Sequence, residues 1–260
     1  MLLFNKVAIV TGIGPAMGRA IALAYAREGA KLVLAARRMD RLQAVLDEVL
    51  AAGGEAIAIP TDITDRTACQ RLVDATLERF GRVDILVQNG HLDGDYKIVI
   101  DSDLNDWRAI MEVNLFGALH LVQLVVPSMR AQRDGRIVLI NTGASTDPPP
   151  LLGAYAASKA ALASLARTIA VELGPDGIRA NGVQLGPVQG ENWHGWVMTG
   201  SKQAGMSPEE FERDQCKNVP LRSVPTAEEC AGAVVFLASD LARPITGQSL
   251  AVNGGRWFVS

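Results

Sequence analysis

The sequence predicts an α/β fold in which helices cover both faces of a doubly wound, parallel, seven-stranded sheet. Short runs of apolar and β-branched residues alternate with longer segments whose apolar residues recur at helical spacing. The short runs are apolar on consecutive residues, which is typical of strands buried on both faces. Right-handed crossovers between such strands produce a doubly wound sheet. No long linker or internal repeat divides the chain, so we expect one domain over residues 1–260.

The strands are expected where four to eight apolar residues lie between turn residues. These runs are Val7–Val10, Lys31–Ala35, Glu55–Pro60, Val83–Gln88, Arg136–Asn141, Arg179–Leu185 and Ser249–Val252. The helical patterns between them cover Ala16–Glu28, Met39–Ala52, Asp65–Phe80, Trp107–Gln132, Tyr155–Gly174 and Thr226–Ser239. Glycines follow the first two of these patterns, as they commonly follow a helix. Gly186–Pro225 has mixed composition beyond a strand end, which predicts a variable substrate lid at about 187–225.

Composition excludes several classes of protein. The net charge of −3 provides no electrostatic case for binding nucleic acid or an acidic membrane. No stretch reaches the ~18 consecutive apolar residues of a membrane span. The apolar N-terminus lacks a basic region and a cleavage site, so we interpret it as a first strand and expect a cytoplasmic globular protein of the size of an enzyme. The distant Cys69, Cys216 and Cys230 predict free thiols and no metal site.

A glycine-rich turn follows the first strand and opens the first helix. It reads TGIGPAMG over residues 11–18 and contains Gly12, Gly14, Met17 and Gly18. Glycines allow the backbone to turn sharply and approach a pyrophosphate, which the N-terminus of the helix attracts. A strand, turn and helix in this order predict a dinucleotide-binding (Rossmann) site.

Tyr155 and Lys159 form a candidate acid–base pair. They lie four residues apart on a predicted helix, so their side chains share a face. A free tyrosine has a pKa of about 10, and a nearby ammonium group favours the phenolate and lowers that value. We therefore expect Tyr155 to exchange a proton with a carbonyl or alcohol oxygen near neutral pH.

Together, the TGIGPAMG turn and the YAASK stretch at 155–159 make the chain resemble a single-domain short-chain dehydrogenase/reductase over nearly its whole length. The resemblance implies hydride transfer between a nicotinamide cofactor and a small-molecule substrate. It also implies that Asn114 holds a water that links Lys159 to solvent, and that the protein is a homotetramer. The apolar tail residues Trp257 and Phe258 are candidates for the contact between subunits.

Further cofactor contacts follow from the resemblance. Asp62 would meet the adenine edge with Ile63 packed beside it, and Asn89 and Gly90 retain part of the motif that follows the fourth strand. After the sixth strand the family's proline has moved and its threonine is Gly190, which leaves the backbone of Val188 to hold the carboxamide.

The end of the second strand favours NADP(H) over NAD(H). Ala36 occupies the position where the family carries an acidic residue for the ribose hydroxyls, and Arg37 and Arg38 follow it. A guanidinium matches the 2′-phosphate by bidentate geometry. The alternative is that both arginines are solvated loop charges.

The catalytic hydroxyl is expected on Thr142. The family places a serine at the end of the fifth strand, usually 13 residues before the tyrosine, and Thr142 stands at that spacing. Threonine offers the same donor and acceptor as serine, with a methyl group that reshapes the pocket. Ser145 is the alternative, three residues later, and would then contact the substrate.

The substrate site is predicted from His91 and the aromatic lid. His91 stands where the family has a glycine, and it would contact substrate, relay a proton or bond to the backbone. Trp193 and Trp196 would cover a hydrophobic cyclic or aromatic ketone or alcohol; alternatively they anchor the lid.

Two other functions remain open. A 3-oxoacyl thioester reductase would need a basic docking patch, for which Arg130 and Arg133 are the candidates. A non-catalytic dinucleotide-binding regulator or scaffold would explain the departures from the family motifs, but it would not need the Asn114, Tyr155 and Lys159 set.

Overall fold

The structure is a computed structural model and describes residues 1–258. The described residues form one parallel sheet of seven strands in the order β3-β2-β1-β4-β5-β6-β7, which confirms the predicted doubly wound sheet. The strands are β1 Val7–Thr11, β2 Lys31–Ala36, β3 Glu55–Pro60, β4 Ile85–Gln88, β5 Gly135–Thr142, β6 Ile178–Leu185 and β7 Ser249–Val252.

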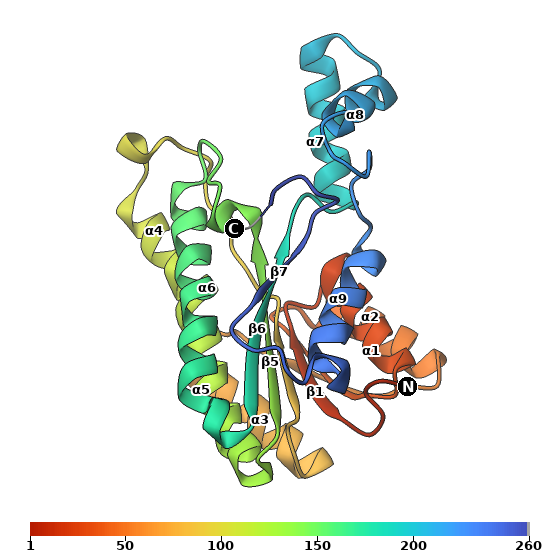
Figure 1. Cartoon of the computed structure of the whole chain (residues 1–260), viewed down its shortest axis with the longest axis vertical. Helices are drawn as coiled ribbons and strands as arrows, with labels where there is room; N and C mark the ends of the chain where they lie inside the picture. The colour runs from red at the N-terminus through yellow and green to blue at the C-terminus, as the bar shows by residue number, and fades with distance from the viewer. Residues whose placement is uncertain (259–260) are drawn as a thin grey trace.

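Helices cover both faces of the sheet (Figure 1). On one face lie α1 Met17–Arg27, α2 Met39–Ala51 and α9 Ala227–Ala238; on the other lie α3 Arg66–Phe80, α5 Gly117–Gln132 and α6 Gly153–Leu173. Neighbouring strand residues enter opposite cores: Val10 packs with the first group and Ile9 with the second. Burial on both faces explains why the strands are continuously apolar.

The long helix before β5 differs from the prediction. It begins at Leu104 and contains α4 Leu104–Met111, a wider π turn at Glu112–Phe116 and then α5. The helix is long and apolar enough to cross a membrane, but it packs against α3 and α6 in this fold. The wide turn buries Asn114 completely, and such turns are frequent at functional sites.

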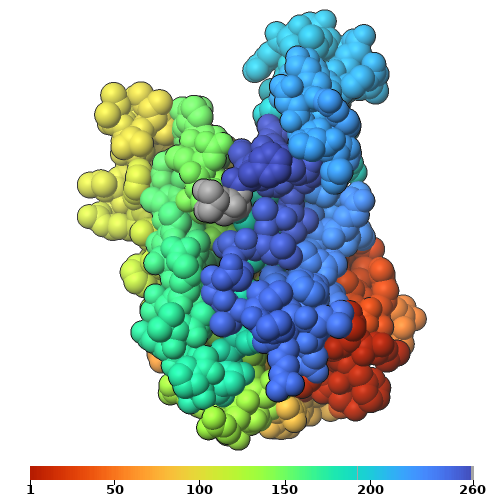
Figure 2. All heavy atoms as spheres, viewed as in Figure 1, coloured from red at the N-terminus to blue at the C-terminus, as the bar shows by residue number. Residues whose placement is uncertain are grey.

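The predicted lid segment contains two helices that the sequence reading did not assign. These are α7 Glu191–Ala204 and α8 Pro208–Cys216, which stand out from the body beyond the carboxyl ends of the strands (Figures 1 and 2). A reciprocal capping box between Ser207 and Glu210 starts α8. The two helices share a small apolar core of their own.

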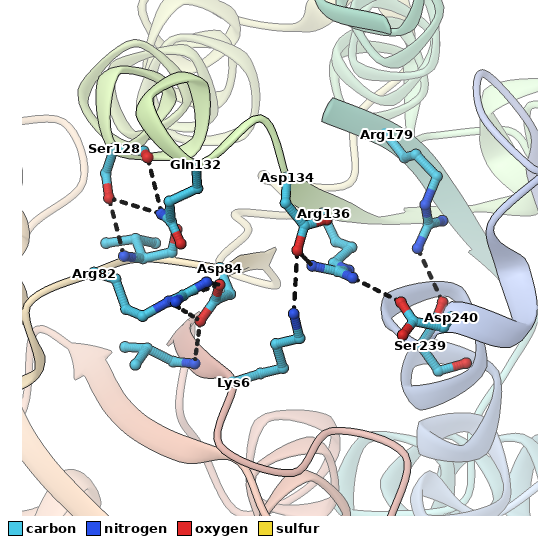
Figure 3. Close-up of polar contacts among 12 residues, drawn as sticks. Lys6, Arg82, Asp84, Ser128, Gln132, Asp134, Arg136, Arg179, Ser239 and Asp240 are labelled. Carbon is cyan, nitrogen blue, oxygen red and sulfur yellow. Dashed lines mark hydrogen bonds and ion pairs between the residues drawn. The ribbon is translucent and has the colours of Figure 1, made fainter. Parts of the chain in front are cut away.

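At the amino ends of the strands, a buried carboxylate holds β1 and β4 together (Figure 3). Asp84, fully buried before β4, accepts a hydrogen bond of 2.8 Å from the backbone nitrogen of Val7. Its two oxygens also receive the guanidinium of Arg82 at 2.6–3.0 Å. The start of β1 is thus tied to the start of β4 by a charge-assisted bond.

A second cluster ties β5 to the same edge (Figure 3). The guanidinium of Arg136, 6% exposed, binds Asp134 at 2.5 Å and Asp240 at 2.7 Å. Lys6 approaches Asp134 to 3.1 Å. These charges are paired at the edge remote from the glycine-rich turn, so we assign them a role in stability.

We predict that Asp84→Ala lowers the free energy of unfolding by about 2–3 kcal/mol, because it leaves the buried nitrogen of Val7 without an acceptor and Arg82 without its partner. Chemical denaturation measures the change. The matched control is Asp74→Ala on the exposed face of α3, which should change stability by less than about 0.5 kcal/mol. An equal loss in both variants would contradict the role given to Asp84.

Candidate active site

A cleft of about 820 Å³ lies at the carboxyl edge of the sheet, where loops from several strands converge. Its volume and its position at the strand ends suit a dinucleotide and a small substrate. The predicted site residues that line it are Gly12, Gly14, Met17, Gly18, Arg37, Arg38, Asp62, Ile63, Asn89, Gly90, His91, Thr142, Tyr155, Lys159 and Val188.

Two glycines of the glycine-rich turn stand where the backbone packs too closely to admit a side chain. A Cβ at Gly12, whose φ is +66°, would lie 2.4 Å from the nitrogen of Gly90. A Cβ at Gly18 would lie 2.5 Å from the carbonyl oxygen of Gly12. Gly14 has no protein atom near its missing Cβ, so its backbone faces the open cleft at the start of α1. This arrangement fits a pyrophosphate at a helix N-terminus.

The segment after β4 fastens this turn. The amide of Asn89 donates to the carbonyl of Gly12 at 2.8 Å, and its backbone nitrogen donates to Thr11 at 3.2 Å. Gln88 receives the hydroxyl of Thr11 and donates to the carbonyl of Gly90 at 3.2 Å. Gln88 therefore links β1 to the segment that follows β4.

The adenosine end of the cleft is rich in arginine. Arg38 is held by Asp40, with one contact at 3.0 Å, and is largely exposed. Arg37 has no hydrogen bond or ion pair with any residue that the structure describes. Arg41, at the start of α2, lines the same end, and the sequence reading missed it. Arg41 follows Arg37 by four residues in the sequence, and this spacing could have indicated that both reach the same end of the cleft.

Asp62 lies opposite these arginines at the end of β3. Burial raises the pKa of its carboxyl, but bonds from Thr64 and the charge of Arg37 together bring the pKa below its usual value. Asp62 accepts from the backbone nitrogen and hydroxyl of Thr64 at 3.0 and 2.8 Å. The carboxylate is therefore ionised and held in position, while Ile63 packs against Gly117 at the cleft wall.

Tyr155 and Lys159 lie in the first two turns of α6, on the face turned to β5. The ammonium of Lys159 donates to the carbonyl of Ile140 at 2.9 Å and lies 5.8 Å from the centre of the Tyr155 ring. Lys159 is 3% exposed, and burial lowers its pKa to about 8. The pair is thus assembled as the spacing indicated, with the lysine fixed by backbone.

The expected low pKa of Tyr155 is not what the structure favours. Burial raises the pKa of the phenol above its usual value, and the charge of Asp93 raises it further. The interaction with the Thr142 side chain opposes this rise. Because burial and the charge of Asp93 together outweigh the interaction with Thr142, Tyr155 is protonated at neutral pH and can act as an acid.

Thr142 and Ser145 have different positions. Thr142 ends β5, lines the cleft and interacts with Tyr155. Ser145 does not line the cleft: its hydroxyl donates to the carbonyl of Thr142 at 2.7 Å and accepts from Gln184 at 3.2 Å. Gln184 on β6 thereby supports the turn that carries Thr142.

Asn114 does not line the cleft but supports the loop beside it. Its amide donates to the carbonyl of Leu92 at 2.9 Å and to Ser158 at 2.9 Å. Its oxygen accepts from the backbone nitrogen of Leu92 at 2.8 Å. The residue therefore joins the segment after β4 to α6, and one acceptor lone pair remains for the water that the resemblance implies.

His91 faces the catalytic tyrosine from the segment after β4. Its Nδ1 lies 3.3 Å from the carbonyl of Asn89, and its ring centre is 6.4 Å from that of Tyr155. Desolvation in the cleft and the charge of Lys159 lower its pKa, while Asp93 opposes this shift. His91 thus both bonds to the backbone of Asn89 and lines the cleft, so two of the roles expected for it are compatible. Asp93 lines the cleft too and was missed by the sequence reading.

The tryptophans are not brought into the cleft. Trp193 is buried between α7 and α8, where its indole nitrogen donates to Glu212 at 2.7 Å. Trp196 stacks on it and tilts against Phe211, with ring centres 5.0 and 5.2 Å apart. The alternative interpretation, that they anchor the lid, describes this packing, because α8 offers them an apolar partner.

Comparison with known proteins agrees with the geometry. Residues 12–256 match the family described as Enoyl-(Acyl carrier protein) reductase. The chain is 34% identical over 251 residues to 7alpha-hydroxysteroid dehydrogenase from Escherichia coli (strain K12), covering 96% of this chain and 94% of the relative. The chain belongs to the short-chain dehydrogenase/reductase family. It is therefore an oxidoreductase that uses a nicotinamide nucleotide.

Other relatives of this short-chain dehydrogenase/reductase act on different substrates. The chain is 31% identical to 3-oxoacyl-[acyl-carrier-protein] reductase from Thermotoga maritima, covering 98% of this chain and 99% of the relative. The crystal structure of NAD+-bound xylitol dehydrogenase superimposes with a TM-score of 0.90 at 30% identity, covering 98% of this chain and all of the other. The names of these proteins span steroids, thioesters and sugar alcohols, so the substrate has to be argued from this chain's own cleft.

We predict that Thr142→Ala lowers kcat/KM at least about a hundredfold, because it removes a hydroxyl that orients the substrate oxygen. Ser145→Ala should lower it by less than about tenfold, since Ser145 supports the turn without lining the cleft. Steady-state kinetics of both variants, with Thr142→Ser as a control expected to retain activity, decide the assignment. A larger loss in Ser145→Ala than in Thr142→Ala would contradict it.

Proposed function

We propose that this short-chain dehydrogenase/reductase is an NADP(H)-dependent ketone reductase and secondary alcohol dehydrogenase. The observation that carries the proposal is Tyr155, half-buried and protonated between Thr142 and Lys159 at the edge of a cleft that begins at the glycine-rich turn. The bound nicotinamide would supply or accept hydride at the substrate carbon. Tyr155 would give its proton to the carbonyl oxygen or take one from the alcohol.

Thr142 and Lys159 would orient the substrate and stabilise the charge that forms on Tyr155. Thr142 would hold the substrate oxygen near the phenol. Lys159, fixed on the carbonyl of Ile140, would keep a positive charge beside the site below a pH of about 8. A phenolate left after proton donation would then be stabilised by that charge.

The preference for NADP(H) is supported by Arg37 and Arg41. Arg38 already has a carboxylate partner in Asp40, whereas the other two guanidiniums have no ion pair within the part of the chain that the structure describes. A 2′-phosphate would supply their missing partner. Ala36 offers no carboxylate that would repel it.

A neutral, hydrophobic cyclic or aromatic carbonyl compound or alcohol is the proposed substrate. Leu92, Val113 and Leu185 line the cleft and would contact its apolar surface. Hydroxysteroid is the substrate class named for one relative, and it has this character. The tryptophans of the lid do not support the proposal, because they pack on α8.

A 3-oxoacyl carrier substrate is less well supported. Arg130 and Arg133, the expected basic patch, lie beside Asp176 and Pro175 at the edge where β5 begins, away from the cleft. The loop at the cleft is acidic instead, with Asp93, Asp95 and further aspartates up to residue 106. Such a loop would repel the acidic groups of a carrier.

We also propose that the protein acts in the cytoplasm as a homotetramer. Cys69, Cys216 and Cys230 are free and buried, which suits a reducing compartment. Phe258 is 86% exposed at the end of the described chain and is available for a subunit contact. Trp257 has a partner within its own chain, since its ring lies against Gly143 and Gly186.

Turnover should require Tyr155. We expect the wild type to reduce apolar cyclic ketones with NADPH at neutral pH, where Tyr155 is protonated, and alcohol oxidation to accelerate as pH rises towards the raised pKa of the phenol. Tyr155→Phe should lower both rates at least about a hundredfold without weakening NADPH binding. Initial rates and fluorescence titration check this; equal turnover by Tyr155→Phe, or none by the wild type, would refute the proposal.

Cofactor preference should depend on Arg37. We predict that Arg37→Ala weakens NADPH binding at least about tenfold and changes NADH binding by less than about threefold, because only NADPH carries the 2′-phosphate. Fluorescence titration of each cofactor measures both constants. Arg27→Ala, on the exposed last turn of α1, is the control and should leave both unchanged. Parallel losses for the two cofactors in Arg37→Ala would contradict the assignment.

A further inference from the structure

The segment after β4 brings a carboxylate and an imidazole to the substrate end of the cleft. Asp93 and His91 both line the cleft with Thr142 and Tyr155. The Nε2 of His91 lies 3.5 Å from Oδ1 of Asp93, and the imidazole faces the Tyr155 ring at 6.4 Å between centres. Both residues follow the Asn89 and Gly90 backbone that fastens the glycine-rich turn, so their place relative to the cofactor end is fixed.

Both groups present hydrogen-bond acceptors to the cleft. The carbonyl of Asn89 can only accept, so its contact of 3.3 Å assigns the proton of the neutral imidazole to Nδ1 of His91. Its Nε2 then carries a lone pair. Asp93 is 37% exposed, and apart from His91 it has no hydrogen-bond or ion-pair partner within residues 1–258. A donor from the substrate would satisfy both acceptors.

The charge around this pair is not neutralised locally. Lys97 on the same loop forms an ion pair with Asp95 at 2.6 Å and is therefore not a partner of Asp93. Lys159 is the cation that lines this end of the cleft, and burial lowers its pKa to about 8.

We propose that Asp93, as an acceptor beside Nε2 of His91, determines substrate specificity: it accepts a hydrogen bond from a hydroxyl beside the reacting carbon and repels a substrate that carries an anion there. The proposal rests on the proposed function and narrows its substrate to a neutral hydroxylated alcohol or ketone. The same carboxylate would disfavour anionic acyl compounds. Site groups that bind a substrate hydroxyl discriminate strongly, because they stay unpaired when the hydroxyl is missing.

The electrostatics of the neighbouring groups agree with this geometry. Desolvation and the charge of Lys159 lower the pKa of His91, which keeps the imidazole neutral and Nε2 available as an acceptor. Asp93 raises the pKa values of both Tyr155 and Lys159 by its negative charge, and Tyr96 adds to the effect on Tyr155. Replacing Asp93 with an uncharged residue should therefore lower the pKa of Tyr155 and shift the pH dependence of alcohol oxidation to lower pH.

The test uses three cyclic secondary alcohols that differ in the substituent next to the reacting carbon: cyclohexanol, cyclohexane-1,2-diol and 2-hydroxycyclohexanecarboxylate. We expect kcat/KM of the wild type with NADP+ to be at least about tenfold higher for the diol than for cyclohexanol, and at least about tenfold lower for the carboxylate. Asp93→Asn, which keeps an acceptor without the charge, should raise the carboxylate value about tenfold or more relative to cyclohexanol. Asp93→Ala should remove the advantage of the diol.

The control is Asp101→Asn, an exposed carboxylate on the same loop that does not line the cleft. It should retain the wild-type ratios. Unchanged ratios in both Asp93 variants would overturn the proposal, and so would equal changes in Asp101→Asn. No oxidation of any of the three alcohols by the wild type would instead count against the proposed function.

An imidazole titration tests the pair without turnover. The chain has three histidines, so NMR of labelled histidine resolves His91 from the other two. Asp93→Asn should lower the pKa of His91, because the carboxylate favours its protonated form. An unchanged pKa would show that Asp93 and His91 do not interact and would overturn the proposal whatever the kinetics.

Discussion

The site depends on how closely two backbone segments approach at the carboxyl ends of β1 and β4. Gly12 and Gly90 are in contact there, and a single methyl group at Gly12 would lie 2.4 Å from the nitrogen of Gly90. Thr11 and Asn89 close the same contact with hydrogen bonds. The turn that would hold a pyrophosphate and the loop that carries His91 and the missed Asp93 are consequently one connected unit. Its geometry follows from adjacent parallel strands, whose carboxyl ends meet at one edge of the sheet.

Much of this arrangement was readable from sequence because it depends on local pattern. Buried parallel strands are continuously apolar, and a pair spaced four residues apart on a helix shares a face. Thr142 was assigned by resemblance to a position 13 residues before Tyr155, and the structure places its side chain at the cleft beside the tyrosine. The rest depends on contacts between segments far apart in the chain. The π turn at Asn114 accompanies bonds to Leu92 and Ser158, and no local pattern announced those bonds.

The pKa values of Tyr155 and Lys159 also depend both on a local pattern and on contacts between distant segments. The sequence reading considered the ammonium of Lys159 beside the phenol of Tyr155 and expected a lowered pKa. The burial that shifts both pKa values arises from contacts between segments far apart in the chain, which the sequence alone does not show. Burial disfavours each charged form, so the tyrosine keeps its proton and the lysine gives up its own more readily. The site is therefore better prepared to donate a proton than to remove one.

The packing of the lid decides which residues are left to recognise the substrate. Trp193 and Trp196 pack with Phe211 of α8, apart from both cores of the sheet, and Trp196 remains 46% exposed. Gly186, Gln189 and the loop from His91 to Asp93 line the cleft, whereas the two tryptophans do not. An uncharged backbone group does not repel an anionic substrate, whereas a carboxylate repels an anion and accepts a hydrogen bond from a hydroxyl. Selectivity in this chain is therefore expected to reside in the loop after β4, with the aromatic lid contributing stability to its own helices.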